Sequence, residues 1–203
     1  MGAPFLDHQC FFLFLGGLLA TLIYSVPAFG RTKRLGMWAN VTIAIPRGCL
    51  LKVAGWTLVA SAFSAEPWAI GSLFGLFLLG ASSTKDFSDA AGDRAGGCET
   101  LPVKYGNRKA VAMISPFFVA PWLLLVGLAW AKDPFTPGQR LLSGNPVLLT
   151  ALGFLLAAWG AYTVHLLRRN PDELATTENH PSWTHMYLML MAAQIGFAAA
   201  YLF

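Results

Sequence analysis

The sequence predicts an all-α integral membrane protein, a single helical bundle of about six transmembrane helices that takes in residues 1–203. Hydrophobic residues make up 56% of the chain and charged residues only 12%, whereas a soluble domain typically carries about 25% charged residues. The apolar residues form continuous runs of membrane-spanning length. These runs do not alternate apolar and polar residues as the strands of a membrane β-barrel do, so the helical class is favoured.

Each of the six apolar stretches is delimited by breaks in the sequence. The stretches run roughly over 10–29, 41–62, 67–84, 110–131, 146–167 and 184–203. The first should end where Pro27 breaks the helix, the second opens after Asn40, and the third has no charge before Lys85. The loop KDPFTPGQRLLSGNP separates the fourth stretch from the fifth, and RRNPDELATTENHPSW separates the fifth from the sixth.

The basic residues are distributed unequally between the two sets of loops that alternate along the chain. One set contains Arg31, Lys33, Arg34, Lys85, Arg94, Lys104, Arg108, Lys109, Arg168 and Arg169, and the other contains Lys132 and Arg140. Basic loops stay on the cytoplasmic side, so the aspartate-rich loop after the third stretch should be cytoplasmic, in an inner or plasma membrane. We therefore attribute the net charge of +4 to membrane orientation, and no basic and aromatic pattern indicates nucleic acid as a partner.

Three aspartates follow the third stretch with the spacing of one helical face. Asp86, Asp89 and Asp93 stand at positions i, i+3 and i+7, so a continuing helix would place them within an arc of about 60°. Like charges in this arrangement repel one another unless a cation neutralises them. Hard oxygen ligands suit Mg²⁺, which usually shares its coordination with substrate phosphates. The alternative is a solvated loop at the end of a helix.

Basic residues beside the aspartates favour an anionic substrate. Lys85 and Arg94 flank the cluster and Lys104 follows it, so all three are candidates to bind a polyanion such as a diphosphate. Arg47 lies inside the second apolar stretch, where a charge costs about 2.5–3.5 kcal/mol and indicates function by default. Arg47 and Asn40 are therefore further candidates for substrate binding, although Arg47 could instead extend to the membrane surface.

The segment KDFSDAAGDRAGGCETLPVKYGNRKA, residues 85–110, closely resembles the second aspartate-rich motif of the UbiA superfamily of intramembrane prenyltransferases. A weaker resemblance lies upstream, where YSVPAFGRTKRLGMWAN, residues 24–40, is similar to the segment between the fourth and fifth helices of that family. The resemblance covers nearly the whole chain, in order, as helices four to nine.

This resemblance implies a UbiA-like bundle around a cavity that opens sideways to membrane lipid. It implies transfer of a prenyl group from an isoprenoid diphosphate to an aromatic, tetrapyrrole or lipid acceptor, with Mg²⁺ as cofactor. Carried onto this sequence, the catalytic metal ligands would be among Asp86, Asp89 and Asp93. The diphosphate contacts would be Lys85, Arg94 and Lys104.

One departure from the family pattern leaves three interpretations open. The first aspartate motif of the family, NDxxDxxxD, is absent, because Asp7 is the only acidic residue before Glu66. The chain is expected to be a piece of an active Mg²⁺-dependent prenyltransferase, a half-enzyme completed by another membrane chain that supplies the missing helices, or a non-catalytic subunit that binds lipid or pigment tails in a larger complex.

Overall fold

The computed structural model describes residues 5–177 and 179–203 and contains the predicted all-α bundle. No β-strand occurs in these two ranges, where Lys132 and Arg140 form one isolated antiparallel bridge. Within the same ranges, five helical stretches are long and apolar enough to cross a membrane, namely His8–Ser25, Ala65–Thr84, Asn107–Leu128, Pro146–Arg169 and Pro181–Leu202. The composition therefore predicted the class of the fold correctly.

The remaining predicted crossing, 41–62, is helical but divided into three segments. Helix α2 spans Met37–Ala44, a π-helical segment spans Ile45–Leu50, and α3 spans Leu51–Trp56. Pro46 has no N–H to donate to the preceding turn, and the wider π turn accommodates this missing bond. The helical stretch thus begins at Met37, earlier than predicted, and ends at Trp56. It ends earlier than predicted because the residues after Trp56 form turns.

The other helices agree with the predicted stretches apart from their ends. The long helices are α1 (Phe5–Ser25), α4 (Ala65–Ala81), α9 (Pro146–Arg169) and α10 (Pro181–Leu202). One crossing is composite, with α7 (Asn107–Ile114), the 3₁₀ turn η5 (Ser115–Phe118) and α8 (Ala120–Leu128) in succession. The short elements are η1 (Pro27–Phe29), η2 (Thr32–Arg34), η4 (Ser82–Thr84), α5 (Asp86–Ala95), α6 (Leu101–Tyr105) and η6 (Glu173–Ala175).

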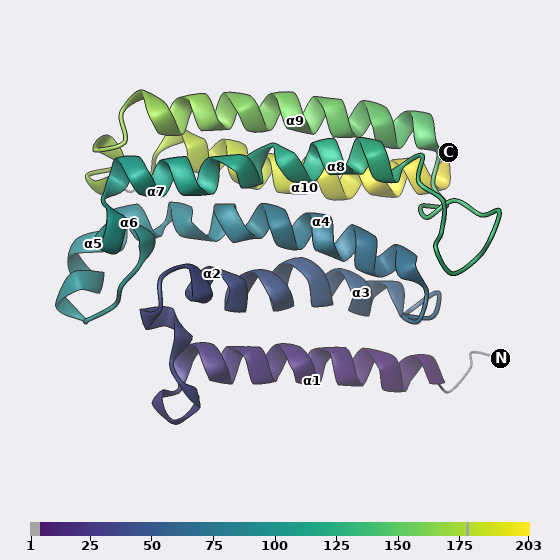
Figure 1. The fold of residues 1–203 in the computed structure, drawn as a ribbon, viewed down its shortest axis with the longest axis horizontal. Helices are drawn as coiled ribbons and strands as arrows, with labels where there is room; N and C mark the ends of the chain where they lie inside the picture. The colour runs from purple at the N-terminus through teal and green to yellow at the C-terminus, as the bar shows by residue number, and fades with distance from the viewer. Residues whose placement is uncertain (1–4, 178) are drawn as a thin grey trace.

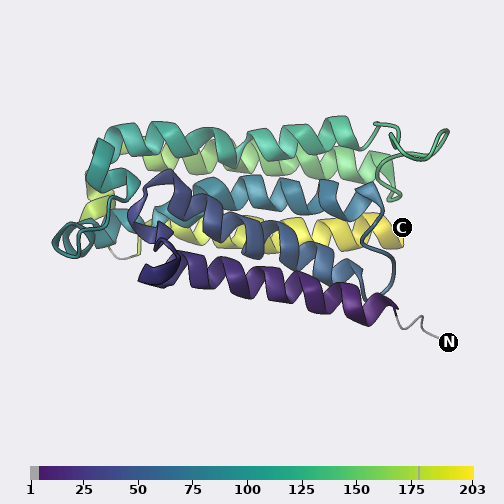
Figure 2. The ribbon, with the colours of Figure 1, turned by 60° about the horizontal axis from the view of Figure 1, so that its bottom comes forward.

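The crossings pack side by side in an order that partly follows the chain. Helix α1 packs on α2–α3, these pack on α4, α4 packs on η5 and α8, α8 packs on α9, and α9 packs on α10. Figures 1 and 2 show α1 at one edge of the bundle and α10 beside α9. Buried aromatic rings of α4 and the composite crossing pack together, with Phe77 5.4 Å from Trp122 and 5.7 Å from Phe118 between ring centroids.

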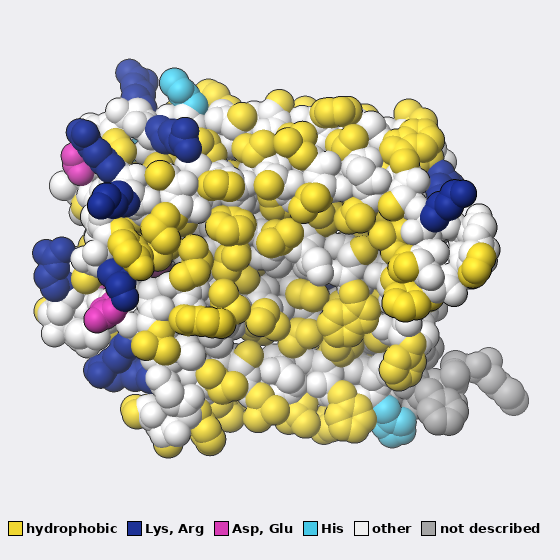
Figure 3. Space-filling model, viewed as in Figure 1, with side chains coloured by type: hydrophobic (Ala, Val, Ile, Leu, Met, Phe, Trp, Pro, Cys, Tyr) yellow, Lys and Arg dark blue, Asp and Glu magenta, His cyan; other side chains and the backbone are white. Residues whose placement is uncertain are grey.

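Charged side chains gather at the ends of the bundle and leave an apolar band between them (Figure 3). The end that carries α5 and α6 shows most of the Lys and Arg side chains in this view, whereas the opposite end shows few. Helix α1 begins and α10 ends at that opposite end (Figure 1). This arrangement agrees with the predicted grouping of the loops, and the cytoplasmic position of the basic end stays a prediction.

The site depends on one close approach between backbones. Gly48 in the π segment lies against Gly75 of α4, and a Cβ added at Gly48 would meet the Cα of Gly75 at 2.4 Å. Only residues without a Cβ allow two helices to approach this closely. The contact holds the π segment, and with it Arg47, beside α4.

Candidate functional site

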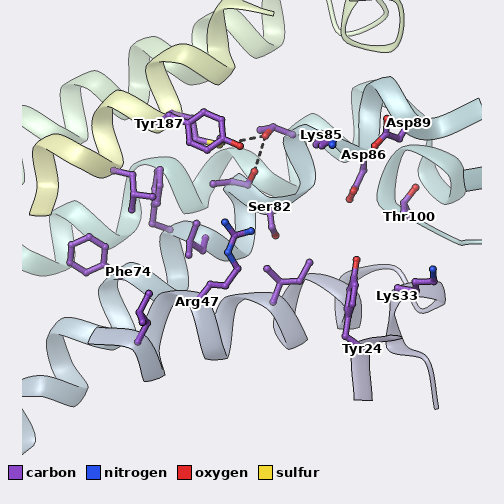
Figure 4. A pocket seen from close by; sticks show the side chains of 18 of the residues that line it. Tyr24, Lys33, Arg47, Phe74, Ser82, Lys85, Asp86, Asp89, Thr100 and Tyr187 are labelled. Carbon is purple, nitrogen blue, oxygen red and sulfur yellow. Dashed lines mark hydrogen bonds between the residues drawn. The ribbon is translucent and has the colours of Figure 1, made fainter. Parts of the chain in front are cut away.

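A cavity of about 590 Å³ opens among α2–α3, α4, α5 and α10. Its lining is polar near α5 and apolar farther along α4, where Phe74, Phe77 and Leu78 contribute. Figure 4 shows Asp86 and Asp89 at one end of the cavity, Phe74 toward the other end, and Arg47 between them. The cavity therefore joins a charged mouth to an apolar interior.

The three predicted aspartates all line this cavity. Helix α4 does not continue straight through them, because the 3₁₀ turn η4 intervenes before α5 begins at Asp86. Helix α5 ends at Ala95, and Gly97 just after it adopts a φ of +67° that glycine tolerates without strain. The chain then returns through α6, whose first turn contains Pro102. These turns place the aspartates over the mouth of the cavity.

The electrostatics at Asp86 show that negative charge is crowded in the mouth. Burial, followed by the negative charges of Asp93 and Asp89, raises the pKa of Asp86 from 3.8 to about 7, and a hydrogen bond with Ser83 opposes this rise. Both burial and a neighbouring carboxylate disfavour the ionised form. A cation bound among these carboxylates would remove this penalty.

Four basic residues line the cavity together with the aspartates, namely Lys33, Arg47, Lys52 and Lys85. None of the four forms an ion pair with an aspartate in the part of the chain that the structure describes. Among the residues that the structure describes, the single ion pair between a carboxylate and Lys or Arg joins Lys104 to Glu99, at 3.1 Å between Nζ and Oε2. Carboxylates and cations thus share one cavity without neutralising one another.

The carboxylates fit Mg²⁺ that is bound jointly with a substrate, rather than a fully formed protein cage. In the described part of the chain, no group of three or more His, Cys, Asp or Glu side chains is placed to hold a metal. Mg²⁺ usually keeps several waters and binds through one or two carboxylates and substrate phosphates. The unneutralised charge around Asp86 suits this second mode of binding.

Three residues that the sequence proposed for substrate binding lie outside the lining of the cavity. Arg94 is exposed on α5, and the exposed Lys104 pairs with Glu99. Asn40 is buried, and its amide donates to Ser83 Oγ and, at 3.2 Å, to the carbonyl oxygen of Leu79. The Asn40 side chain therefore lies outside the cavity and bonds to Ser83, which stands between the lining residues Ser82 and Thr84.

The structure adds residues that the sequence did not identify as part of the site. Tyr24, Thr100, Tyr187 and Gln194 line the same cavity, and the last two come from α10. Gln194 carries a polar group inside an apolar span, which is a signal of function that the sequence does contain. Tyr187 and Thr100 offer no comparable signal, because nothing local relates them to Asp86.

Comparisons with known proteins agree with the family resemblance of the aspartate-rich segment, residues 85–110. The chain matches the model of the UbiA prenyltransferase family over residues 1–182. It is 30% identical over 146 residues to chloroplastic chlorophyll synthase of Arabidopsis thaliana. The matched residues cover 72% of this chain and 34% of that protein. It is 28% identical over 151 residues to the chloroplastic 2-acyl-4-prenylphloroglucinol 6-prenyltransferase of Humulus lupulus, covering 71% of this chain and 36% of that protein.

A third relative matches a longer part of this chain. Digeranylgeranylglyceryl phosphate synthase of Methanobrevibacter smithii is 25% identical over 168 residues, which cover 82% of this chain and 55% of that protein. The chain thus spans about a third of the two plant proteins and about half of the archaeal one. No solved structure matches the chain. With a family model that covers most of its length and the aspartate-rich segment at the mouth of its cavity, the chain belongs to the UbiA prenyltransferase family.

Proposed function

We propose that this chain carries the second half of a prenyltransferase active site, in which Asp86, Asp89 and Asp93 bind Mg²⁺ together with an isoprenoid diphosphate. One observation carries the proposal. The three carboxylates and the cations Lys85 and Arg47 line one cavity and form no ion pairs with one another. A metal diphosphate would satisfy both sets, because its metal binds carboxylates and its phosphate oxygens bind cations.

The residues of the mouth would stabilise the departing diphosphate. Lys85, Arg47 and Lys33 donate hydrogen bonds to its oxygens, and this stabilises the charge that develops as the allylic C–O bond breaks. Bound Mg²⁺ would neutralise further negative charge on the same leaving group. Arg94 and Lys104 are exposed at the same end of the bundle, so we retain them as outer contacts of the diphosphate.

Buried residues behind the mouth and the apolar interior complete the proposed site. Asn40 donates a hydrogen bond to Ser83 and so holds the turn η4 that leads into Asp86. The apolar rings along α4 exclude water from the allylic carbocation. The acceptor then attacks the cation at its prenyl C1 and loses a proton. Its class stays open among aromatic, tetrapyrrole and lipid acceptors, and we place the mouth on the cytoplasmic side of the membrane.

A non-catalytic role is the second candidate. The first aspartate motif of the family does not occur in this chain, and the described residues contain no ready-made three-ligand metal site. On this alternative, the cavity binds a lipid or pigment tail as a subunit beside another membrane chain. Binding of such a tail would require neither Mg²⁺ nor a diphosphate.

Binding of geranylgeranyl diphosphate to the protein in lipid nanodiscs, with and without Mg²⁺, tests the proposal. We expect Mg²⁺-dependent binding that Asp89→Ala abolishes. The control Glu173→Ala removes an exposed carboxylate at the same end of the bundle that does not line the cavity, and it should bind as the wild type does. Diphosphate binding that does not depend on Mg²⁺, or that is unchanged in Asp89→Ala, would contradict the metal-ligand assignment and favour the non-catalytic alternative.

A further inference from the structure

Basic side chains gather where the first turn of α7 meets the last turn of α9. Arg108 lies in that first turn, Arg168 and Arg169 end α9, and all three residues are exposed. The side-chain amide of Asn107 donates a hydrogen bond to Asp172 at 3.4 Å, so the start of α7 lies beside the chain that leaves α9. Figure 3 shows Lys and Arg side chains over this corner of the bundle.

Arg168 is held in place through one edge of its guanidinium. Its Nε–H donates to Ser115 Oγ at 3.3 Å, and this buried hydroxyl donates in turn to the carbonyl oxygen of Val111 at 2.6 Å. In the described part of the chain, no other side-chain hydrogen bond or ion pair engages Arg168. A guanidinium has five donors in a fixed fork, so its two Nη groups remain available to an anion that accepts from both.

Arg108 stands on the side of α7 that faces this anchored guanidinium. It precedes Ser115 by seven residues, and positions seven apart share one helical face. Lys109, the next residue, is turned away from that face by about 100°. Neither Arg108 nor Arg168 forms an ion pair with a carboxylate in the ranges 5–177 and 179–203. Two arginines without a counter-ion therefore occupy one corner of the bundle.

The corner lies at the level where lipid headgroups would meet the protein. Its arginines stand within two residues of the ends of two candidate spans, Asn107–Leu128 and Pro146–Arg169. Ala161 and Phe154 precede Arg168 by seven and fourteen residues and are both exposed, so an apolar strip continues from Arg168 along the same side of α9. The arginines fit a phosphate and the strip fits hydrocarbon, and a phospholipid contains both parts.

We propose that Arg108 and Arg168 bind the phosphate of an anionic phospholipid, whose acyl chains lie along the exposed strip of α9. Basic residues between helices on the cytoplasmic side of a membrane attract anionic headgroups. A headgroup with a net negative charge neutralises the arginines, whereas a choline headgroup carries a cation of its own. Both arginines lie outside the lining of the central cavity, so this inference does not rest on the proposed function. The bound lipid would join α7 to α9.

Native mass spectrometry of the protein released from detergent micelles tests the site by titration with palmitoyl-oleoyl phosphatidylglycerol or phosphatidylcholine. One basic residue near the surface contributes about fivefold to the attraction of an anionic lipid, so the two arginines should favour phosphatidylglycerol by about tenfold or more. Arg108→Gln and Arg168→Gln should each weaken its binding about fivefold, and the double variant should lose the preference. The control Lys109→Gln removes the neighbouring charge that is turned away, and it should keep the wild-type preference.

Three results would overturn the lipid site. The first is a wild type that binds both lipids equally, and the second is a folded double variant that still prefers phosphatidylglycerol. The third is displacement of phosphatidylglycerol by inorganic phosphate, which would identify a site for free anions. The double variant should fold, because both replaced side chains are exposed and Ser115 keeps its bond to Val111; its melting temperature in micelles checks this. Its Mg²⁺-dependent diphosphate binding, measured separately, should equal that of the wild type.

Discussion

Replacement of Gly48 by alanine should separate the π segment from α4 and so disturb both stability and the site. The new Cβ would meet the Cα of Gly75 at 2.4 Å, its nitrogen at 2.7 Å and the Phe74 carbonyl oxygen at 2.9 Å. Ordinary contact begins at 3.4 Å, so the two helices would have to part by about 1 Å. The clashing atoms belong to backbone, which cannot move aside as a side chain can.

The expected magnitude follows from two opposing effects. Overpacking of this kind typically costs about 1–3 kcal/mol, and we expect the upper half of that range because backbone meets backbone. Alanine in place of glycine in a helix returns about 1 kcal/mol. The free energy of unfolding of Gly48→Ala should therefore fall by about 1–2 kcal/mol.

Gly55 in α3 provides a matched control in the same crossing, because nothing lies within 4 Å of a Cβ added there. Gly55→Ala should raise the free energy of unfolding by up to about 1 kcal/mol. Unfolding in mixed micelles by titration with denaturing detergent measures both variants. Gly48→Ala should also weaken Mg²⁺-dependent diphosphate binding, since Arg47 moves with the π segment. Equal stability and equal binding in the two variants would refute the reasoning.

Three further predictions concern packing and charge. Asn40→Leu leaves two acceptors without their donor and should lower the free energy of unfolding by about 1–3 kcal/mol; detergent titration that finds no loss would contradict this. Gly160→Ala places a Cβ 1.9 Å from the Phe118 carbonyl oxygen, whereas a Cβ at Gly127 meets nothing within 4 Å, so only the first variant should lose thermal stability in micelles; similar melting temperatures would refute the packing. In chelator-treated protein, the folded state binds the Asp86 proton more tightly than the unfolded state does, because folding raises the pKa of Asp86 from 3.8 to about 7. The free energy of unfolding should therefore fall as pH rises from about 4 to about 7. Asp86→Asn should remove this dependence of stability on pH. A slope unchanged in that variant would mean that another group titrates.

The sequence by itself determined the class of the fold and the family. Long apolar runs with few charges leave a chain no alternative to membrane-spanning helices, because every backbone group in lipid must find its partner within the helix. The spacing of Asp86, Asp89 and Asp93 also placed three carboxylates together at one mouth, since residues three and seven apart share a helical face. These are local properties, and local periodicity is sufficient to predict them.

Only the tertiary structure decided what stands opposite the aspartates. It brings Arg47 into the cavity through a π segment, leaves Arg94 outside the lining, and joins Lys52 to Gln194 across 142 positions of sequence. Such pairs depend on how closely α2–α3, α4 and α10 approach one another. That distance is set by contacts between helices, as at Gly48, and the pattern of a single helix does not contain it.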